Sequence, residues 1–418
     1  MLNTGEIIRG ESGRNFTIRA FLGRGGQGIV YTGENTLDGA KVVVKLYNPE
    51  LDTPATRSRL DRLMALGAAG SSPLALLPID RFRCARGLGH IDPFSPGISL
   101  EAFLEAPGCD LQSCVFIGLQ IAQAFALLHA SNVTHGDPQA NNVLIEKRGD
   151  CHHVLLIDFD NAIFPGGEPP PCVGHNLYMA PELRSAFSRG TPAVPCCASD
   201  VFGLAVLLHE VILQRHPAAG LDSSESEFDR AMTAGLWAHD PGLAVRPNSD
   251  VVGGYPSEVL DSELSRLLRL SFSKDPARRP TASVWVTTLQ KALFKMFSCP
   301  RCGGQVVIDS SKLSCPYAGC RKPYPLLGLS LPGRTILLND GTTVVGREHF
   351  GGLPGISRRH VVLSREGPEV WMEDISTSGT YRWNDSKWVC LEHGKKALLQ
   401  AGDTLAIGGM VVRVTQTK

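Results

Sequence analysis

The stretch HGDPQANN at residues 135–142, with the triplet DFD at residues 158–160, carries the most information about the fold and chemistry of this chain. Asn142 follows Asp137 by five residues, and Asp158 comes directly after a short apolar run. Transfer of a γ-phosphoryl group needs one group that orients the attacking hydroxyl, and oxygen ligands that fix Mg²⁺ on the phosphates. Asp137 suits the first task, whereas Asn142 and Asp158 suit the second. The pattern therefore favours nucleotide-dependent phosphoryl transfer.

A glycine-rich segment, FLGRGGQGIVYTG, precedes this stretch. Gly23, Gly25 and Gly28 have the G-x-G-x-x-G spacing, and glycine lets a backbone approach phosphates without a Cβ clash. Dinucleotide-binding folds share this spacing, but in those folds the glycines open a helix. Here two β-rich runs follow, and the second ends at Lys45. We therefore expect a glycine-rich hairpin and a further strand; the alternative is a hairpin with an ordinary surface lysine.

Taken together, these motifs resemble the glycine-rich loop, the catalytic loop and the magnesium loop of protein kinases. The resemblance implies a two-lobed kinase-like domain over residues 16–294. It implies that Asp137 is the catalytic residue and that Asn142 and Asp158 hold Mg²⁺. It also implies that ATP is bound by five residues: Gly23, Gly25, Gly28, Val30 and Lys45.

Later landmarks agree with this resemblance. Glu182 stands in the motif YMAPEL and Arg279 in DPARRP, and the equivalent residues of protein kinases form a buried ion pair. Asp200 begins an apolar helical pattern, and its equivalent braces the catalytic loop. We therefore expect structural roles for these three residues.

Several positions depart from the kinase pattern. Gly136 stands where many kinases have the arginine that clamps a phosphate on the activation segment, and residues 161–177 contain no serine or threonine. We therefore expect that phosphorylation of serine or threonine in this segment does not regulate the protein. Gln139 replaces a frequent lysine, and Asp160 replaces the usual glycine of the magnesium triplet. Neither change removes the base or a metal ligand.

The helix expected after Lys45 contains no glutamate to pair with that lysine. Its apolar face is formed by Leu60, Leu63 and Met64. Asp61 is a candidate partner for the lysine, although its side chain is one methylene shorter than glutamate. A solvated helix residue is an equally good interpretation of Asp61.

Four cysteines gather in residues 296–325. They form two pairs, CPRC and CPYAGC, which offer four thiolates to one tetrahedral Zn²⁺. A segment of about thirty residues buries too little core to fold alone, so metal binding would supply the missing stability. No ligand position remains for water, which predicts a structural zinc ribbon; the alternative is four unrelated free cysteines. The predicted ligands are Cys299, Cys302, Cys315 and Cys320.

Residues 328–416 consist of short alternating runs separated by turns, which predicts an all-β sandwich. Its motifs GR at 346–347, SRRH at 357–360 and STSGT at 376–380 resemble the loops of forkhead-associated (FHA) domains, which bind phosphothreonine peptides. The resemblance implies a phosphothreonine site made by Arg347, Ser357, Arg358, Thr377 and Ser378. It implies a bracing role for His360. A bare sandwich with surface arginines is the alternative.

One FHA position departs from its family. Ser378 stands where FHA domains usually have an asparagine that grips the peptide backbone. Serine is shorter and lacks the paired donor and acceptor of an amide. We therefore expect an altered affinity or selectivity for peptides.

Length and composition limit the possible classes of protein. At 418 residues the chain is expected to form two or three domains. Acidic and basic residues number 41 each, so the overall charge favours neither a nucleic acid nor a membrane as a partner. We expect no secretory leader and no bilayer-spanning stretch. The twelve cysteines are spread along a long chain, which favours reduced thiols and a cytoplasmic location.

The sequence thus predicts a multidomain α+β protein with a kinase-like domain, a zinc ribbon and an FHA sandwich. The expected reaction transfers phosphate from ATP, with Mg²⁺, to serine or threonine of protein substrates, and phosphothreonine-bearing proteins are the expected partners of the FHA domain. The arrangement is also similar to bacterial kinases that accompany a metal-dependent protein phosphatase and a von Willebrand-A protein. The alternative is a catalytically weak or silent pseudokinase that acts as a phosphopeptide-binding scaffold.

Overall fold

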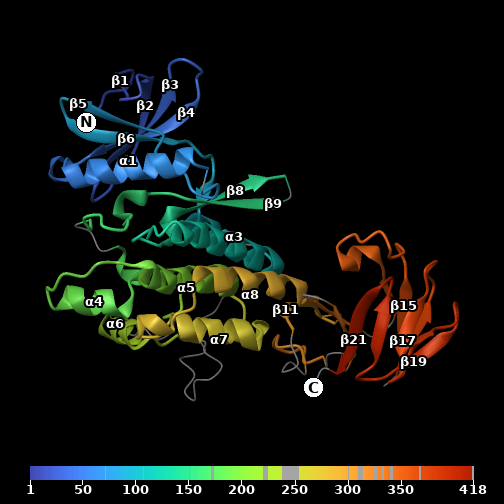
Figure 1. Ribbon diagram of the computed structural model, residues 1–418. Coiled ribbons are helices and arrows are strands. Elements are labelled where there is room, and N and C mark those ends of the chain that lie inside the picture. Colours follow the sequence, from blue (N-terminus) through green and yellow to red (C-terminus); the bar gives the residue numbers. More distant parts are fainter. Residues whose placement is uncertain are drawn as a thin grey trace. The chain divides into compact units, whose positions relative to one another are not determined.

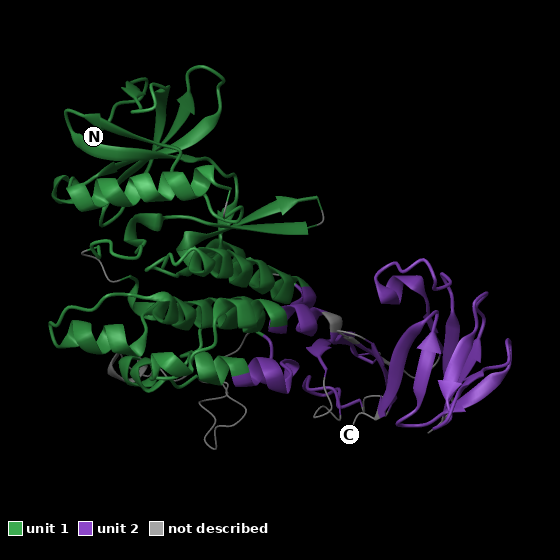
Figure 2. Cartoon of the chain, in the orientation of Figure 1, with its two compact units in different colours: residues 1–109, 113–254, 267–287 green, residues 110–112, 255–266, 288–418 purple. Residues whose placement is uncertain are grey.

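The computed structural model describes residues 1–70, 72–106, 108–149, 151–170, 174–219, 225–237, 254–299, 301–308, 314–322, 327–331, 334–338, 342–366 and 369–416. The chain divides into two compact units (Figure 2). Unit 1 comprises residues 1–109, 113–254 and 267–287, and unit 2 comprises residues 110–112, 255–266 and 288–418.

Unit 1 begins with a small lobe built on a six-stranded antiparallel sheet (Figure 1). Its order is β1-β2-β3-β4-β6-β5, with β1 at Ile7–Arg9, β2 at Asn15–Arg24, β3 at Gly28–Asn35, β4 at Lys41–Tyr47, β5 at Asp80–Cys84 and β6 at Gly87–Pro93. Alternate side chains of β3 and β4 are buried, as the period of a strand requires. Phe16, Tyr31 and Val44 lie in the core of this sheet.

Helix α1, Pro54–Ala68, lies along the small-lobe sheet (Figure 1). The hydroxyl of Thr53 accepts a hydrogen bond from the amide of Thr56, and Pro54 occupies the first turn, where its missing N–H costs nothing. Leu60 and Leu63 are buried, so the predicted apolar face of the helix is present.

The large lobe carries a three-stranded sheet, β7-β8-β9, with β7 at Ile98–Ser99, β8 at Val143–Arg148 and β9 at Cys151–Leu156. The catalytic loop enters β8, and the DFD triplet follows β9. Pairing of β8 with β9 therefore brings the ends of these two loops together.

The helices that follow are α2 at Leu100–Glu105, α3 at Leu111–Ala130, α4 at Pro181–Ser188, α5 at Cys197–Leu213, α6 at Glu225–Ala234, α7 at Ser262–Ser271 and α8 at Ala282–Phe294. Most of their residues complete the large lobe, and one end each of α3, α7 and α8 is assigned to unit 2. Helix α5 is buried along nearly its whole length and forms the centre of the lobe. Glu182 and Arg279 make the expected ion pair through two hydrogen bonds, of 2.7 and 2.6 Å.

By length and composition, α3 could cross a membrane, contrary to the expectation that the chain has no such stretch. Sixty-seven per cent of its most apolar window is buried inside the protein. A core helix of a globular domain has the same property, so this helix gives only weak evidence for a membrane span.

Unit 2 contains the cysteine cluster and a β-sandwich. A hairpin of β10, Met296–Ser298, and β11, Gln305–Val307, frames the first cysteine pair. One sheet of the sandwich has the order β13-β12-β21-β20-β17-β18, and the other has the order β14-β15-β16-β19. These strands are β12 at Leu327–Leu331, β13 at Arg334–Leu337, β14 at Thr342–Val345, β15 at Val361–Glu366, β16 at Glu369–Asp374, β17 at Thr380–Trp383, β18 at Trp388–Cys390, β19 at Lys396–Leu399, β20 at Thr404–Ile407 and β21 at Met410–Gln416. The predicted fold class is confirmed.

Candidate functional site

A cavity of about 280 Å³ is lined by residues of both lobes of unit 1. Val30 and Lys45, two of the predicted nucleotide-binding residues, line it together with Asp158. Its wall also includes Leu22 and Ile157, which sequence analysis did not select. A mostly apolar cleft with a few polar and charged groups suits a nucleotide, whose base is apolar on its faces and whose phosphates are charged.

The glycine-rich hairpin lies between β2 and β3. The amide of Gly25 donates to the carbonyl of Gly28 across 2.9 Å, which closes the turn. A Cβ at Gly28 would lie 2.3 Å from the carbonyl oxygen of Leu46, so only glycine fits there. Around Gly23 and Gly25, by contrast, an added Cβ would meet open space.

The magnesium loop supplies the carboxylates that meet Lys45. Its ammonium lies 2.9 Å from Oδ1 of Asp158 and also contacts Oδ2 of Asp160. Oδ1 of Asp160 accepts a hydrogen bond of 2.5 Å from the hydroxyl of Tyr47. Burial opposes the charge of Asp160, but the charges of Lys45 and His90 and the hydrogen bonds from Lys45 and Tyr47 together outweigh burial and lower the pKa of this carboxyl to about 2.

Asp61 does not pair with Lys45. Its side chain is 54% exposed, and its Oδ1 lies 2.5 Å from Nη1 of Arg81. The second interpretation of Asp61, a solvated residue of the helix, therefore fits the structure.

The carboxylate of Asp137 accepts three hydrogen bonds. Oδ1 accepts from the backbone amide of His175 at 2.9 Å, and Oδ2 accepts from Gln139 Nε2 at 2.7 Å. Asn142 Nδ2 lies 3.2 Å from the same Oδ2. These donors hold the carboxylate in one orientation, and the amide oxygen of Asn142 remains available for a cation.

Asp200 braces the catalytic loop, as the resemblance implied. Its carboxylate accepts from the amides of His135 and Gly136, at 2.7 and 3.0 Å. Gly136 has φ +79°, and an added Cβ would lie 2.3 Å from the carbonyl oxygen of Asn161. An arginine therefore does not fit at this position without a change in the backbone.

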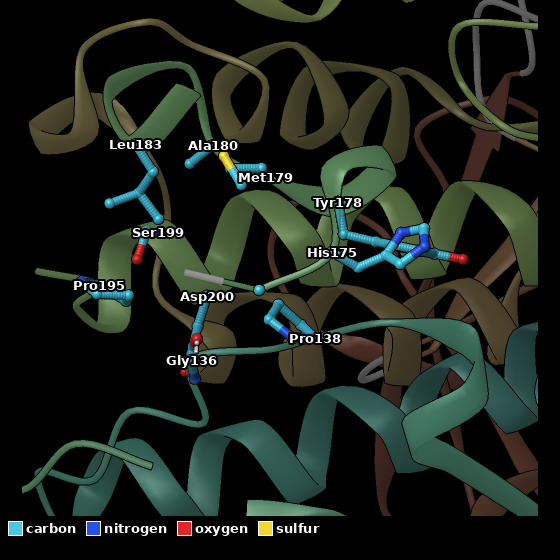
Figure 3. A pocket seen from close by; sticks show the side chains of 11 residues that line it. Gly136, Pro138, His175, Tyr178, Met179, Ala180, Leu183, Pro195, Ser199 and Asp200 are labelled. Atoms are coloured by element: carbon cyan, nitrogen blue, oxygen red, sulfur yellow. Dashed lines mark hydrogen bonds between the residues drawn. The ribbon is translucent and has the colours of Figure 1, made fainter. Parts of the chain in front are cut away.

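The end of the activation segment covers the catalytic loop. Figure 3 shows a small hollow in which His175 and Tyr178 stand opposite Pro138 and Asp200. The hydroxyl of Tyr178 donates to Glu210 across 2.8 Å and fixes the segment on α5. Burial, only partly opposed by this hydrogen bond, raises the pKa of Glu210 to about 7. Residues 171–173 of the segment lie outside the described residues.

The family models agree with this geometry. A model of the protein kinase domain matches residues 16–291, and a model of the FHA domain matches residues 336–408. The chain therefore belongs to the protein kinase domain family and carries an FHA domain.

Its relatives include bacterial kinases. The chain is 25% identical over 366 residues to protein kinase YegI of Escherichia coli K12, a match that covers 80% of this chain and 53% of YegI. It is 30% identical over 271 residues to serine/threonine-protein kinase PknD of Mycobacterium tuberculosis H37Rv, covering 63% of this chain and 37% of PknD. It is 29% identical over 227 residues to serine/threonine-protein kinase PknE of the same strain, covering 53% and 38%. The chain thus spans about half or less of the length of these curated relatives.

The four predicted zinc ligands lie together in unit 2. The sulfur atoms of Cys299, Cys302, Cys315 and Cys320 all lie within 4.8 Å of one another. The Cys299–Cys320 and Cys302–Cys315 sulfur pairs are each 3.6 Å apart. Four thiolates around one Zn²⁺ stand about 3.8 Å apart, because each Zn–S bond is about 2.3 Å long. The cluster therefore fits Zn²⁺ with a closed set of ligands.

The FHA loops converge at one end of the sandwich. Arg347 Nε donates to the carbonyl of Ile356 at 2.8 Å, so the arginine is anchored beside the loop that bears Ser357. The hydroxyls of Ser357 and Thr377 lie 3.2 Å apart, and Arg358 is exposed. The structure thus brings Arg347, Ser357 and Thr377 close to one another through shared loop contacts.

His360 and Ser378 both make hydrogen bonds that connect these loops. His360 is fully buried; its Nδ1 accepts from the amide of Ser357 at 3.2 Å, and its Nε2 donates to the carbonyl of Gly379 at 3.2 Å. Burial lowers the pKa of His360, which keeps the ring neutral and matches this tautomer. Ser378 Oγ donates to the carbonyl of Gly355, so the serine contacts the neighbouring loop.

Proposed function

We propose that this chain is an ATP- and Mg²⁺-dependent protein kinase that phosphorylates serine or threonine of protein substrates. The observation that carries this proposal is the group formed by Lys45, Asp158 and the cavity they line, with Asp137 and Asn142 on the adjoining loop. Similarity to two bacterial serine/threonine-protein kinases supports the choice of acceptor.

Each residue has a task that its chemistry allows. Asp137 orients the substrate hydroxyl and accepts its proton, and Lys45 contacts the α- and β-phosphates. Asn142 and Asp158 would hold Mg²⁺, and the ion would offset the negative charge on the phosphates. Gly23, Gly25, Gly28 and Val30 cover the nucleotide.

The proposal is tested by phosphate transfer from labelled ATP with wild-type protein and an Asp158→Ala variant. We expect incorporation into a generic protein substrate by the wild type and a loss of at least about a hundredfold in the variant, because one ligand of Mg²⁺ is gone. Calorimetric titration with MgATP accompanies the assay. Equal incorporation by both proteins would contradict the assignment of Asp158.

A second candidate function is a pseudokinase scaffold. The observation that favours it is the contact of Gln139 with Asp137, in a place where many kinases have a lysine. Without that positive charge the transferring phosphate is less well stabilised. Saturable binding of MgATP without any transfer would select this alternative.

We further propose that the FHA domain binds proteins that carry phosphothreonine, through Arg347, Ser357, Arg358, Thr377 and Ser378. Arginine is suited to a phosphate dianion because its planar group donates two parallel hydrogen bonds. Tethering a reader to a kinase raises the local concentration of marked partners to about millimolar for a short linker. Phosphorylated substrates would thereby be retained near the kinase domain.

An Arg347→Ala variant is expected to lose phosphothreonine peptide binding by about tenfold to a hundredfold, because a charged hydrogen-bonding group is removed. Fluorescence anisotropy with matched phosphorylated and unphosphorylated peptides measures this. Arg359→Ala is the control, since Arg359 is an exposed neighbour outside the predicted site. Turnover of a generic peptide should be unchanged in both variants. Equal losses of binding in the two variants would contradict the assignment of Arg347 to the phosphothreonine site.

The cysteine cluster is proposed to hold a structural Zn²⁺ through Cys299, Cys302, Cys315 and Cys320, which supports the fold of this segment. We also propose a cytoplasmic location. A metal-dependent protein phosphatase and a von Willebrand-A protein are proposed as partners, on the resemblance to bacterial kinases alone.

A further inference from the structure

Lys45, the lysine proposed to contact the nucleotide phosphates, pairs with carboxylates from a different segment than the one used in protein kinases. In protein kinases a glutamate of the helix packed against the small-lobe sheet pairs with this lysine. Here α1 contains a single acidic residue, Asp61, which bonds to Arg81 instead. Both carboxylates that contact Lys45 come from the magnesium loop, at Asp158 and Asp160.

The side of α1 that meets the magnesium loop and the segment after it is basic. Arg59 Nε donates to the carbonyl of Ala162 at 2.9 Å, and Arg62 Nη1 donates to the carbonyl of Pro165 at 3.1 Å. The guanidinium of Arg62 also lies 4.4 Å from the ring centre of Phe164. The helix therefore binds the backbone that follows the DFD triplet and offers no carboxylate to Lys45.

Asp160 is buried, and each of its carboxylate oxygens has a partner. The residue is 6% exposed, and one carboxylate oxygen accepts from the hydroxyl of Tyr47 while the other contacts Lys45. Tyr47 lies two residues after Lys45 on β4, so both partners of the carboxylate come from one strand and the same face of the sheet. Glycine, the usual residue at this point of the triplet, would leave a buried hydroxyl and a buried ammonium without this acceptor.

We propose that Asp160 is a positioning residue that replaces the helix glutamate: its carboxylate, held by Tyr47, fixes Lys45 for contact with the nucleotide phosphates. This inference rests on the proposed kinase function. The partner of Lys45 and the magnesium ligand Asp158 thus belong to one loop, which positions both groups.

The test compares Asp160→Asn with Asp61→Asn in the full chain. Asparagine has nearly the same shape as aspartate, and its amide oxygen can still accept from Tyr47. We expect Asp160→Asn to raise KM for MgATP and lower kcat, with kcat/KM reduced by about tenfold to a hundredfold, the range for loss of a hydrogen bond between charged groups. Asp61→Asn should change neither constant by more than about twofold. Equal effects of the two variants would overturn the proposal.

A second measurement does not depend on turnover. Calorimetric titration with MgATP gives the Kd of the wild type, Asp160→Asn and Asp61→Asn. We expect Asp160→Asn to raise this Kd by about tenfold, because Lys45 loses one of the two carboxylates that hold it, and Asp61→Asn to leave the Kd within about twofold of wild type. An unchanged Kd in Asp160→Asn would overturn the proposal even in a protein without kinase activity.

Tyr47→Phe provides a variant that leaves every charge in place. It removes only the hydroxyl that holds Asp160, so we expect a smaller rise in KM for MgATP, by about fivefold. Thermal unfolding of each variant identifies any that does not fold, and Tyr47→Phe then carries the test in place of Asp160→Asn. A Tyr47→Phe protein with wild-type KM and wild-type Kd for MgATP would contradict the arrangement. If wild-type protein binds MgATP without transferring phosphate, and Asp160→Asn weakens this binding as expected, the kinase proposal fails and the role of Asp160 stands.

Discussion

Replacing Asp137 by asparagine is expected to lower kcat for phosphoryl transfer by about 10²- to 10⁴-fold, the contribution usual for a positioned general base. The amide has nearly the same shape but cannot accept the proton of the substrate hydroxyl. The donors that surround Asp137 in the structure, His175 N–H, Gln139 and Asn142, orient the group but do not replace it. Initial rates with a protein substrate at saturating MgATP measure the effect.

The control for this variant is Asp38→Asn, which changes an exposed turn residue of the small lobe. Binding of MgATP should be the same in both variants, because Asp137 does not line the nucleotide cavity described above. If kcat of Asp137→Asn stays within a few-fold of the wild-type value, another group accepts the proton of the substrate hydroxyl.

The second large effect is expected at the cysteine cluster. Cys315→Ser should abolish zinc binding and unfold the segment around it, because the thiolate is buried and metal binding provides about 10–16 kcal/mol of apparent free energy in small zinc domains. Metal analysis of the purified chain should fall from one Zn²⁺ to none, and limited proteolysis should cut within residues 296–325.

Cys151→Ser is the matched control, since Cys151 is an exposed thiol on β9, outside the cluster. It should keep one Zn²⁺ per chain and the wild-type cleavage pattern. Full zinc occupancy in Cys315→Ser would mean that this sulfur is not a ligand.

The sequence predicted those parts of the molecule in which spacing determines chemistry. The positions of Lys45, Asp137 and Asp158 follow from motifs that fix each residue at the end of a strand or in a short loop, and the structure brings Lys45 and Asp158 together. The four cysteines were predictable for the same reason, because ligand pairs in tight turns must converge on one metal.

Contacts between distant segments were harder to predict. The pairing of Asp61 with Arg81 depends on how α1 packs beside β5, which no local pattern in the chain encodes. The contact of Asp160 with Lys45 likewise depends on how β4 packs against the magnesium loop, which the triplet alone does not encode. The signal was present in the sequence: an extra acid in the triplet accompanies a helix without glutamate.

The close approach of Gly136 to Asn161 also constrains how this protein can evolve. An arginine at position 136 would need a different backbone conformation and displacement of the opposite carbonyl, and it would have no phosphorylated serine or threonine to bind in residues 161–177. An arginine at position 136 alone would disturb the backbone, and a serine or threonine in residues 161–177 alone would have no arginine to bind its phosphate. Lineages that carry this loop are therefore expected to acquire new regulation through accessory domains, leaving the activation segment as it is.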